Sequence, residues 1–423
     1  MFKKFFHLSN ILCTVFILLF IYLISNINIQ SSLLDPLDSA LKDFEITDIV
    51  YSQFRHTSHQ EDASFVIGES TADTNIVIVN IGELSRAELA VELMNVGKFK
   101  PKVIGIDAFF RKPKEDIEGD SMLSRALQLT PNVVLVSKLH YNEQTDNFDS
   151  LELSHPIFSN YSNQAFANLI TGEDKASKTA RTFNPISICN NKKEISFPVK
   201  LASYLNKAQT DKFLSRNNDV EIINFRGNLN KYHVLDINDL YNDSIDKSFI
   251  KGKIVLMGFI GRSWHESSWE DMFYSPLNKN YAGKAYPDIY GIVVHANIIS
   301  MVLNNDAIDV MPSWLGYLIG IILCHLNVVI FHYILKNHGM WYGALTKFLQ
   351  LLQSVVLILV ILYIYDIHSY KIESSLSFAA IVLGGDLIEI WFDGIMHIKL
   401  SKLAMKQYIK LKNINFKNKK LTP

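Results

Sequence analysis

Four long apolar segments constrain this chain more than any other feature of its 423 residues. One lies near the start, and three follow a long polar stretch near the end: Phe5 to Ile27, Trp314 to Leu335, Phe348 to Tyr365 and Ser374 to His397. A helix of roughly 17 to 25 apolar residues can cross the hydrocarbon core of a bilayer. The sequence therefore predicts one transmembrane helix, a large intervening domain and a group of three transmembrane helices.

The first apolar segment has two interpretations, a cleaved signal peptide or a permanent anchor. The residues that follow it, SNINIQSSLL, contain no Ala-x-Ala-like cleavage site. This absence favours the uncleaved anchor.

The distribution of lysine predicts how the helices cross the membrane. Lysines gather at the N-terminus, in the link that holds Lys336 and Lys347, and at the C-terminus, whereas the link at 366–373 has one lysine and two acids. Cytoplasmic loops carry the excess of basic residues, so we expect both termini in the cytoplasm of a bacterium and the middle domain outside its inner membrane. The expected parts are a transmembrane anchor at 1–27, an extracytoplasmic domain at 28–311, three transmembrane helices at 312–398 and a basic cytoplasmic tail at 399–423.

The tail carries many lysines and no acid between Lys399 and Lys420. It is open to three interpretations: an amphipathic helix on anionic lipid, a docking site for a cytoplasmic protein, or a stop signal that fixes the topology. The expected partners are the bilayer, an extracytoplasmic ligand or protein, and a cytoplasmic or membrane protein; self-association is left open.

Ionisable residues in the last spans suggest an intramembrane polar seam. Asp386, Glu389 and Asp393 have the i, i+3, i+7 spacing of one helix face. His325 and His332, in the first of the three C-terminal spans, lie at depths similar to those of Asp386 and Asp393, so two pairs are expected. Because such groups are costly in hydrocarbon without a partner, the seam is either structural or a proton or signal relay.

The middle domain has the composition of a globular protein and must be stabilised by its core. Cys13 and Cys324 lie in apolar segments, which leaves Cys189 without a disulfide partner in the domain. Nothing suggests a thiolate metal site, and the net charge of −1 gives no general attraction to nucleic acid.

The middle domain alternates short apolar runs with amphipathic segments. Ile76 to Ile81, Val103 to Ile106 and Val133 to Ser137 are predicted to be strands, and helices are expected at Ser85 to Val96 and Gly119 to Leu129. Ser85 followed by Glu88 matches a capping box. This βαβαβ pattern predicts parallel strands.

The remainder of the domain is less regular. Hairpins or loops are expected between Leu139 and Ser196, followed by a helix, two strands and an apolar helix at 197–206, 220–225, 254–257 and 289–304. The predicted fold is α/β, with a mixed, largely parallel sheet flanked by helices, plus the four-helix transmembrane part.

Ligands of open parallel sheets bind beyond the carboxyl ends of the strands. This rule selects Asp107, Gly258 and Arg262. Asp107 is interpreted either as a ligand anchor or as a cap on the following turn. Gly258 would leave backbone N–H groups accessible to an anion beside Arg262.

Three further residues are candidates for a pocket near this edge. Asp271 precedes a turn, and His295 and Asn297 are polar groups in an apolar helix. For His295 the alternatives are a buried, hydrogen-bonded structural role and ligand contact. No phosphate-binding or dinucleotide fingerprint and no metal-ligand spacing is present, so we expect no cofactor and no catalysis.

Several motifs resemble those of the second class of CHASE domains, which are extracellular sensory domains of bacterial adenylate cyclases and histidine kinases. Over about 260 residues the motifs occur in the family's order: DFEITDIVYSQFR at 43–55, NIVIVNIGELS at 75–85, VIGIDAFF at 103–110, FP at 197–198, INFRG at 223–227, KGKIVLMG at 251–258, DMFYSPL at 271–277 and GIVVHANIISMVL at 291–303. Three transmembrane helices after the domain are also the family's usual arrangement.

The sequence also departs from this family. Gly82 stands where the family usually has an aspartate, and the Trp-Pro stretch that commonly follows is absent. Family receptors continue into an output domain, but the residues after the last span are too few for one. The resemblance therefore implies a membrane-anchored sensory or ligand-binding protein that signals through a separate cytoplasmic partner. The alternative is a structural subunit of an envelope membrane complex that senses nothing.

Overall fold

The computed structural model describes residues 7–26, 45–54, 73–142, 144–171, 179–237, 239–242, 246–262, 271–278 and 286–396. The chain divides into two compact units. Residues 35–308 form one, called here the α/β unit, and residues 1–34 with 309–423 form the other, the helical unit. The predicted basic tail at 399–423 lies outside the described residues.

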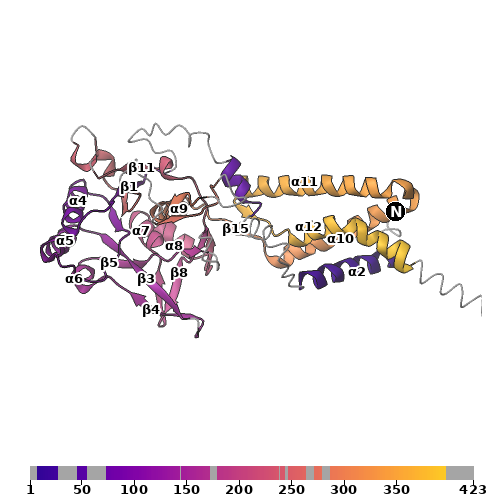
Figure 1. Cartoon of the computed structure of the whole chain (residues 1–423), viewed down its shortest axis with the longest axis horizontal. Helices are drawn as coiled ribbons and strands as arrows, with labels where there is room; N and C mark the ends of the chain where they lie inside the picture. Colours follow the sequence, from indigo (N-terminus) through magenta and orange to yellow (C-terminus); the bar gives the residue numbers. More distant parts are fainter. Residues whose placement is uncertain are drawn as a thin grey trace, which may run out of the picture. The chain divides into compact units, whose positions relative to one another are not determined.

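The α/β unit is built on a mixed sheet, which among the described residues has nine strands (Figure 1). The strand order is β11-β1-β12-β2-β3-β4-β8-β9, and β5 also pairs with β3. Every pairing is parallel except β3 with β4 and β8 with β9. These strands are β1 (Ile76–Asn80), β2 (Val103–Ile106), β3 (Val133–Asn142), β4 (Asn147–Glu152), β5 (Asn163–Phe166), β8 (Ile186–Cys189), β9 (Lys192–Ile195), β11 (His233–Leu235) and β12 (Ile254–Gly258).

The mixed, mostly parallel sheet flanked by helices confirms the predicted fold class. The expected strand at 220–225 is reduced to two residues, because β10 (Glu221–Ile222) pairs with a separate small sheet. The other short strands are β6 (Ile170–Thr171), β7 (Ala180–Phe183), β13 (Met272–Phe273) and β14 (Ile289–Tyr290).

Helices cover both faces of the sheet. On one face lie α4 (Arg86–Lys98) and α5 (Ile117–Leu129), and on the other α7 (Phe197–Leu205) and α9 (Gly291–Asn304). The predicted capping box starts α4: Ser85 accepts from the Glu88 N–H, and Glu88 accepts from the Ser85 N–H. Other helical segments are η1 (Val50–Phe54), α6 (Pro156–Ser159), α8 (Lys207–Leu214), η3 (Leu229–Lys231), η4 (Asp239–Tyr241) and η5 (Ser248–Ile250).

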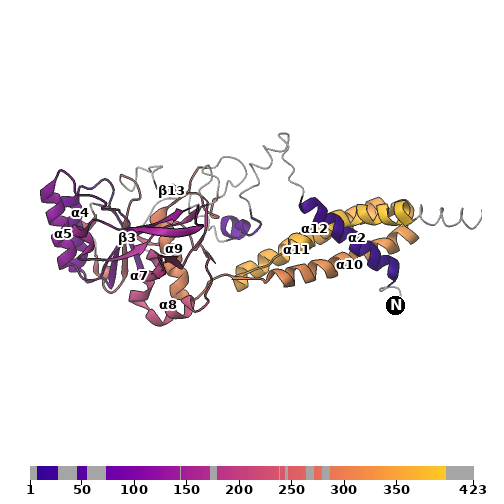
Figure 2. The ribbon, with the colours of Figure 1, turned by 90° about the horizontal axis from the view of Figure 1, so that it is seen from below.

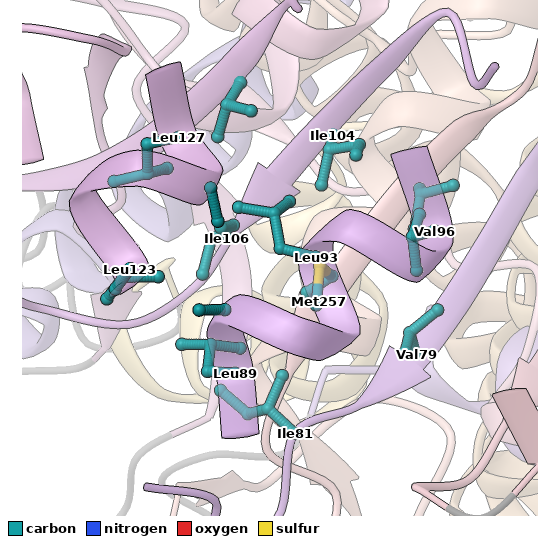
Figure 3. Close-up of a cluster of buried hydrophobic side chains, with 14 of the residues drawn as sticks. Val79, Ile81, Leu89, Leu93, Val96, Ile104, Ile106, Leu123, Leu127 and Met257 are labelled. Carbon is teal, nitrogen blue, oxygen red and sulfur yellow. The ribbon is translucent and has the colours of Figure 1, made fainter. Parts of the chain in front are cut away.

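Side-chain alternation along the strands builds the core beneath α4 and α5. Alternate residues of β1, β2 and β12 face the two helices, so that Val79, Ile106 and Met257 share one buried cluster with Leu93 and Leu123 (Figure 3). All of these side chains are buried. Because both faces of the central strands are covered, their sequences are continuous apolar runs.

The other face of the sheet packs so closely on α7 that position 105 must lack a side chain. A Cβ at Gly105 would lie 2.6 Å from Leu201 Cδ1 and 2.7 Å from Phe197 Cζ. We therefore expect Gly105→Val to destabilise the α/β unit by about 3 kcal/mol through overpacking. Pulse proteolysis of the full chain in urea measures this change.

A second glycine substitution provides the control. At Gly97 in α4 a Cβ would meet the Thr130 methyl at an ordinary 3.4 Å. Gly97→Ala should leave stability unchanged or raise it by about 0.5 kcal/mol, because alanine favours the helix. A Gly105→Val protein that unfolds at the parent's urea concentration would contradict the close packing.

In its described part the helical unit has four apolar helices, α2 (Leu8–Ser25), α10 (Ser313–Asn337), α11 (Tyr342–His368) and α12 (Ser375–Glu389) (Figure 2). α12 continues as the π-helix η7 (Ile390–Met396), and η6 (Gly339–Trp341) precedes α11. With η7 included in the last one, all four helices are long and apolar enough to cross a membrane. A short parallel pair joins β15 (Asp309–Val310), which precedes α10, to β16 (Tyr370–Lys371), in the link between α11 and α12.

Candidate functional site

Two of the predicted site residues meet at the carboxyl end of β2. Asp107 follows this strand, and its N–H donates to the Met257 carbonyl at 2.8 Å. The Nε2 atom of His295, in α9, lies 4.0 Å from Asp107 Oδ2, and the two side chains are 3% and 15% exposed. Among the described residues, the buried Nδ1 atom of His295 has no hydrogen-bond partner. Phe197 adds an aromatic wall, with its ring edge-on to the imidazole at a centroid distance of 5.3 Å.

Burial pushes both members of this pair towards their neutral forms. Desolvation, with a smaller contribution from the charge of Asp271, raises the pKa of Asp107 to about 7. Desolvation alone lowers the pKa of His295 to about 4. Near pH 6 the carboxyl is therefore protonated and the imidazole neutral. Such a pair can take up or release a proton, or form hydrogen bonds with a polar group that enters.

Asn297 is hydrogen-bonded to the backbone through both atoms of its amide. Its side chain is fully buried, and its Oδ1 accepts from the N–H groups of Arg226 and Gly227 at 2.7 and 3.3 Å. Its Nδ2 donates to the carbonyls of Gly227 and Val293 at 3.0 and 2.9 Å. The amide thus holds the Arg226–Gly227 turn against α9, and ligand contact by Asn297 stays a prediction.

The other three predicted rim residues are more dispersed. Gly258 ends β12 under α9, where a Cβ would lie 2.8 Å from Ile292. Arg262 is on the surface, and its Nε lies 3.0 Å from Glu83 Oε1. Asp271 accepts the Gly291 N–H through its backbone carbonyl at 3.0 Å, and its charge acts on Asp107. The structure therefore brings Asp107, His295 and Asp271 towards one centre, and Arg262 into a separate surface pair.

Asn80 is a rim residue that the sequence reasoning missed. It ends β1 with no exposed surface, and its Oδ1 accepts from the N–H groups of Gly82 and Ile260 at 3.0 and 3.1 Å. Its Nδ2 donates to Asp236 at 2.8 Å. A lone asparagine at the end of an apolar strand was the available signal. At the same turn Gly82 has a φ of +44°, and a Cβ there would lie 2.7 Å from Ile237 Cδ1, so a side chain at this position is disfavoured.

Glu92 is a second missed residue. It lies on the buried side of α4 with no exposed surface, and among the described residues neither of its carboxylate oxygens has a hydrogen-bond partner. Burial, together with the charge of Asp236, raises its pKa to about 8. The predicted amphipathic pattern gave no sign that this carboxyl faces inward.

In the helical unit the predicted polar seam is paired differently. His325 contacts Thr14 Oγ1 at 2.9 Å instead of Asp386, which pairs with Lys347 at 2.8 Å. His332 hydrogen-bonds to Asn10 at 2.8 Å and stacks on Phe392 at a centroid distance of 3.8 Å.

The acids of α12 and its continuation lie on an exposed face. Asp386, Glu389 and Asp393 are all exposed on the surface of the helical unit. The sequence spacing placed them correctly on one face, but that face is turned outward. The two histidines instead join α10 to α2, through polar residues that the prediction had not considered.

Neutral side chains of α11 supply interhelical contacts that the sequence reasoning missed. Tyr342 donates to the Gly385 carbonyl at 2.7 Å, and Gln350 donates to the Ile381 and Val382 carbonyls at 2.8 and 2.9 Å. Gln353 donates to Asn327 at 2.8 Å. The signal was a polar residue at every third or fourth position of an apolar span.

Comparison with known proteins adds one match. A family model described as CHASE2 domain matches residues 16–330, which is more than half of the chain. No curated protein and no solved structure matches. The match extends from within α2, through the α/β unit with Asp107 and His295, into α10. The chain therefore belongs to the CHASE2 family of extracellular sensory domains.

Proposed function

We propose that this chain is an extracytoplasmic sensory protein of a bacterial inner membrane and that it passes its signal to a separate cytoplasmic or membrane partner. Both termini lie in the cytoplasm in this proposal, and the α/β unit lies outside. Support comes from the family, from the four apolar helices and from the lysine distribution of the sequence.

The observation that carries the proposal is the buried pair of Asp107 and His295. Two ionisable groups 4.0 Å apart, nearly excluded from water, are costly for stability alone. Buried groups with strongly shifted pKa values are candidates for function. We place the responding centre here, with Asp107 as the group whose protonation or ligation differs between two states of the domain.

The test uses protons as the probe and the full chain in its native membrane. A photo-crosslinking amino acid at Tyr408 in the tail captures the neighbouring cytoplasmic protein at external pH 7.5 and 5.5. We expect a discrete crosslinked product whose yield differs between the two pH values. Asp107→Asn, which imitates the protonated carboxyl, should fix the yield at its pH 5.5 level, and Asp149→Asn, at an exposed site on β4, should respond like the parent.

A second candidate function is a structural subunit that holds an envelope complex together. It is favoured by the tight packing around Asp107, of which only 15% of the side chain is exposed. In that case a partner copurifies in fixed ratio, and the crosslink yield is the same at both pH values and in the Asp107→Asn protein. This combination would contradict the sensory proposal.

A further inference from the structure

A small hollow lies in the α/β unit away from the Asp107 centre. Its volume is about 130 Å³, and it is lined by the β8–β9 hairpin and by the end of α8 with the segment that follows. Ile186, Phe213 and Leu214 contribute apolar lining. A cavity of about 150 Å³ accommodates a molecule of the size of benzene. The hollow therefore suits a ligand of roughly six to eight non-hydrogen atoms.

Two side chains of opposite charge also line the hollow. Lys193 comes from β9, and Asp219 from the segment between α8 and β10. Both are exposed, and neither forms an ion pair with a described residue. One hollow thus offers a cation and an anion that do not neutralise each other, beside apolar side chains. This set complements a small molecule that carries both charges.

The third charged residue of the lining is fixed by its neighbours. Glu221 is 3% exposed, and it accepts from Arg216 Nε at 2.7 Å and from Asn218 at 3.0 Å. Its charge is therefore satisfied within the protein. Asp219 is left as the acid of the lining that can pair with a ligand.

We propose that this hollow binds a small α-amino acid. The ligand carboxylate pairs with Lys193, its ammonium group pairs with Asp219, and a short side chain packs against Phe213 and Leu214. The proposal rests on the proposed sensory function and names the class of ligand for it. Because the charged partners are exposed, each contributes modestly, and recognition depends on both charges being present in one molecule.

The position of the hollow suits a signal that leaves towards the membrane helices. Arg216, which holds Glu221 in the lining, also donates to the Ile308 carbonyl at 3.1 Å. Ile308 is the last residue of the α/β unit, and β15 follows it directly in the sequence. A ligand that moves the segment 217–221 therefore acts, through one ion pair, on the point where the chain leaves the unit.

Isothermal titration of the full chain in nanodiscs tests the site. We expect L-alanine, L-serine or L-valine to bind, and propionate and propylamine, which each lack one charge, to bind about two- to fivefold more weakly. Lys193→Met and Asp219→Asn should each weaken amino-acid binding about two- to fivefold. Both residues are exposed, so the variants should fold.

Matched controls come from the same elements. Lys192→Met lies next in sequence on β9, and Asp211→Asn lies on α8, where Asp211 pairs with Lys207 at 2.7 Å; neither residue lines the hollow. Both should bind like the parent. The absence of amino-acid binding at millimolar concentration, or equal affinity in the Lys193→Met protein, would overturn the proposal.

Failure of the amino-acid proposal can be distinguished from failure of the sensory proposal. If no amino acid binds but the tail crosslink still responds to pH, only the ligand assignment fails. If alanine binds at this site and the crosslink responds neither to alanine nor to pH, the site stands and the sensory function fails.

Discussion

Replacing Asn297 by alanine is expected to destabilise the α/β unit by about 4 kcal/mol. The substitution removes the partners of three backbone groups of the turn, the N–H groups of Arg226 and Gly227 and the carbonyl of Gly227. Each buried polar group left unpaired costs about 1 to 3 kcal/mol. Pulse proteolysis of the full chain across a urea series measures the loss.

Asn304 on the same helix provides the control. It is exposed, and it donates to the Ser300 carbonyl and to Asp73. Asn304→Ala should therefore cost less than about 1 kcal/mol, because water replaces the lost partners. If Asn297→Ala were as stable as the parent and changed only the response to a ligand, the structural role of Asn297 would be wrong and the ligand contact predicted from the sequence would be right.

The sequence was sufficient for features that depend on neighbouring residues. The unbroken apolar run of β1 and the Ser85–Glu88 capping box each specify local structure, and both are present. The parallel direction of β1, β2 and β3, which are joined by crossover helices, was also predictable, because such connections admit few alternatives. The reduced strand β10 was not, since whether Val220 to Phe225 pairs depends on which strand lies beside it.

The site was predictable only in part, for a related reason. Asp107 follows a strand whose end the pattern locates, so its place at the rim could be predicted. The role of Asn297 depends on a turn 70 residues earlier in the sequence, and no local pattern shows what lies opposite a helix. In the helical unit the spacing of Asp386, Glu389 and Asp393 defined one face but not the direction in which that face points, which the packing of α12 on α10 sets.

The second large effect is expected in how stability depends on pH. The folded-state pKa of Asp107 is about 7 against an ordinary value of 3.8, so between these pH values the native state retains a proton that the unfolded chain has lost. Stability from this group therefore falls as the pH rises through 7. For His295, with a pKa of about 4 against 6.5, the unfolded chain binds the extra proton, and stability falls as the pH drops through 4. Between about pH 4 and 6.5 the two slopes oppose each other and largely cancel.

Single substitutions should uncover each slope. In the Asp107→Asn protein only the titration of His295 remains. We expect its free energy of unfolding to fall by roughly 3 kcal/mol relative to that of the parent between pH 6.5 and 4. In the His295→Gln protein only the titration of Asp107 remains, and its free energy of unfolding should fall by roughly 4 kcal/mol between pH 4 and 7. Pulse proteolysis at steps across this range measures both curves against the parent, which cancels the contributions of Glu92 and other buried acids. An ion pair, in which Asp107 is charged and His295 protonated in the folded state, would show in the parent, because each substitution removes one partner.

With such an ion pair the stability of the parent would be greatest between the ordinary pKa values of 3.8 and 6.5 and would fall on both sides of this range. The shape of the parent's curve therefore decides whether burial or mutual attraction controls the protonation of this centre, and the two variants give the contribution of burial alone.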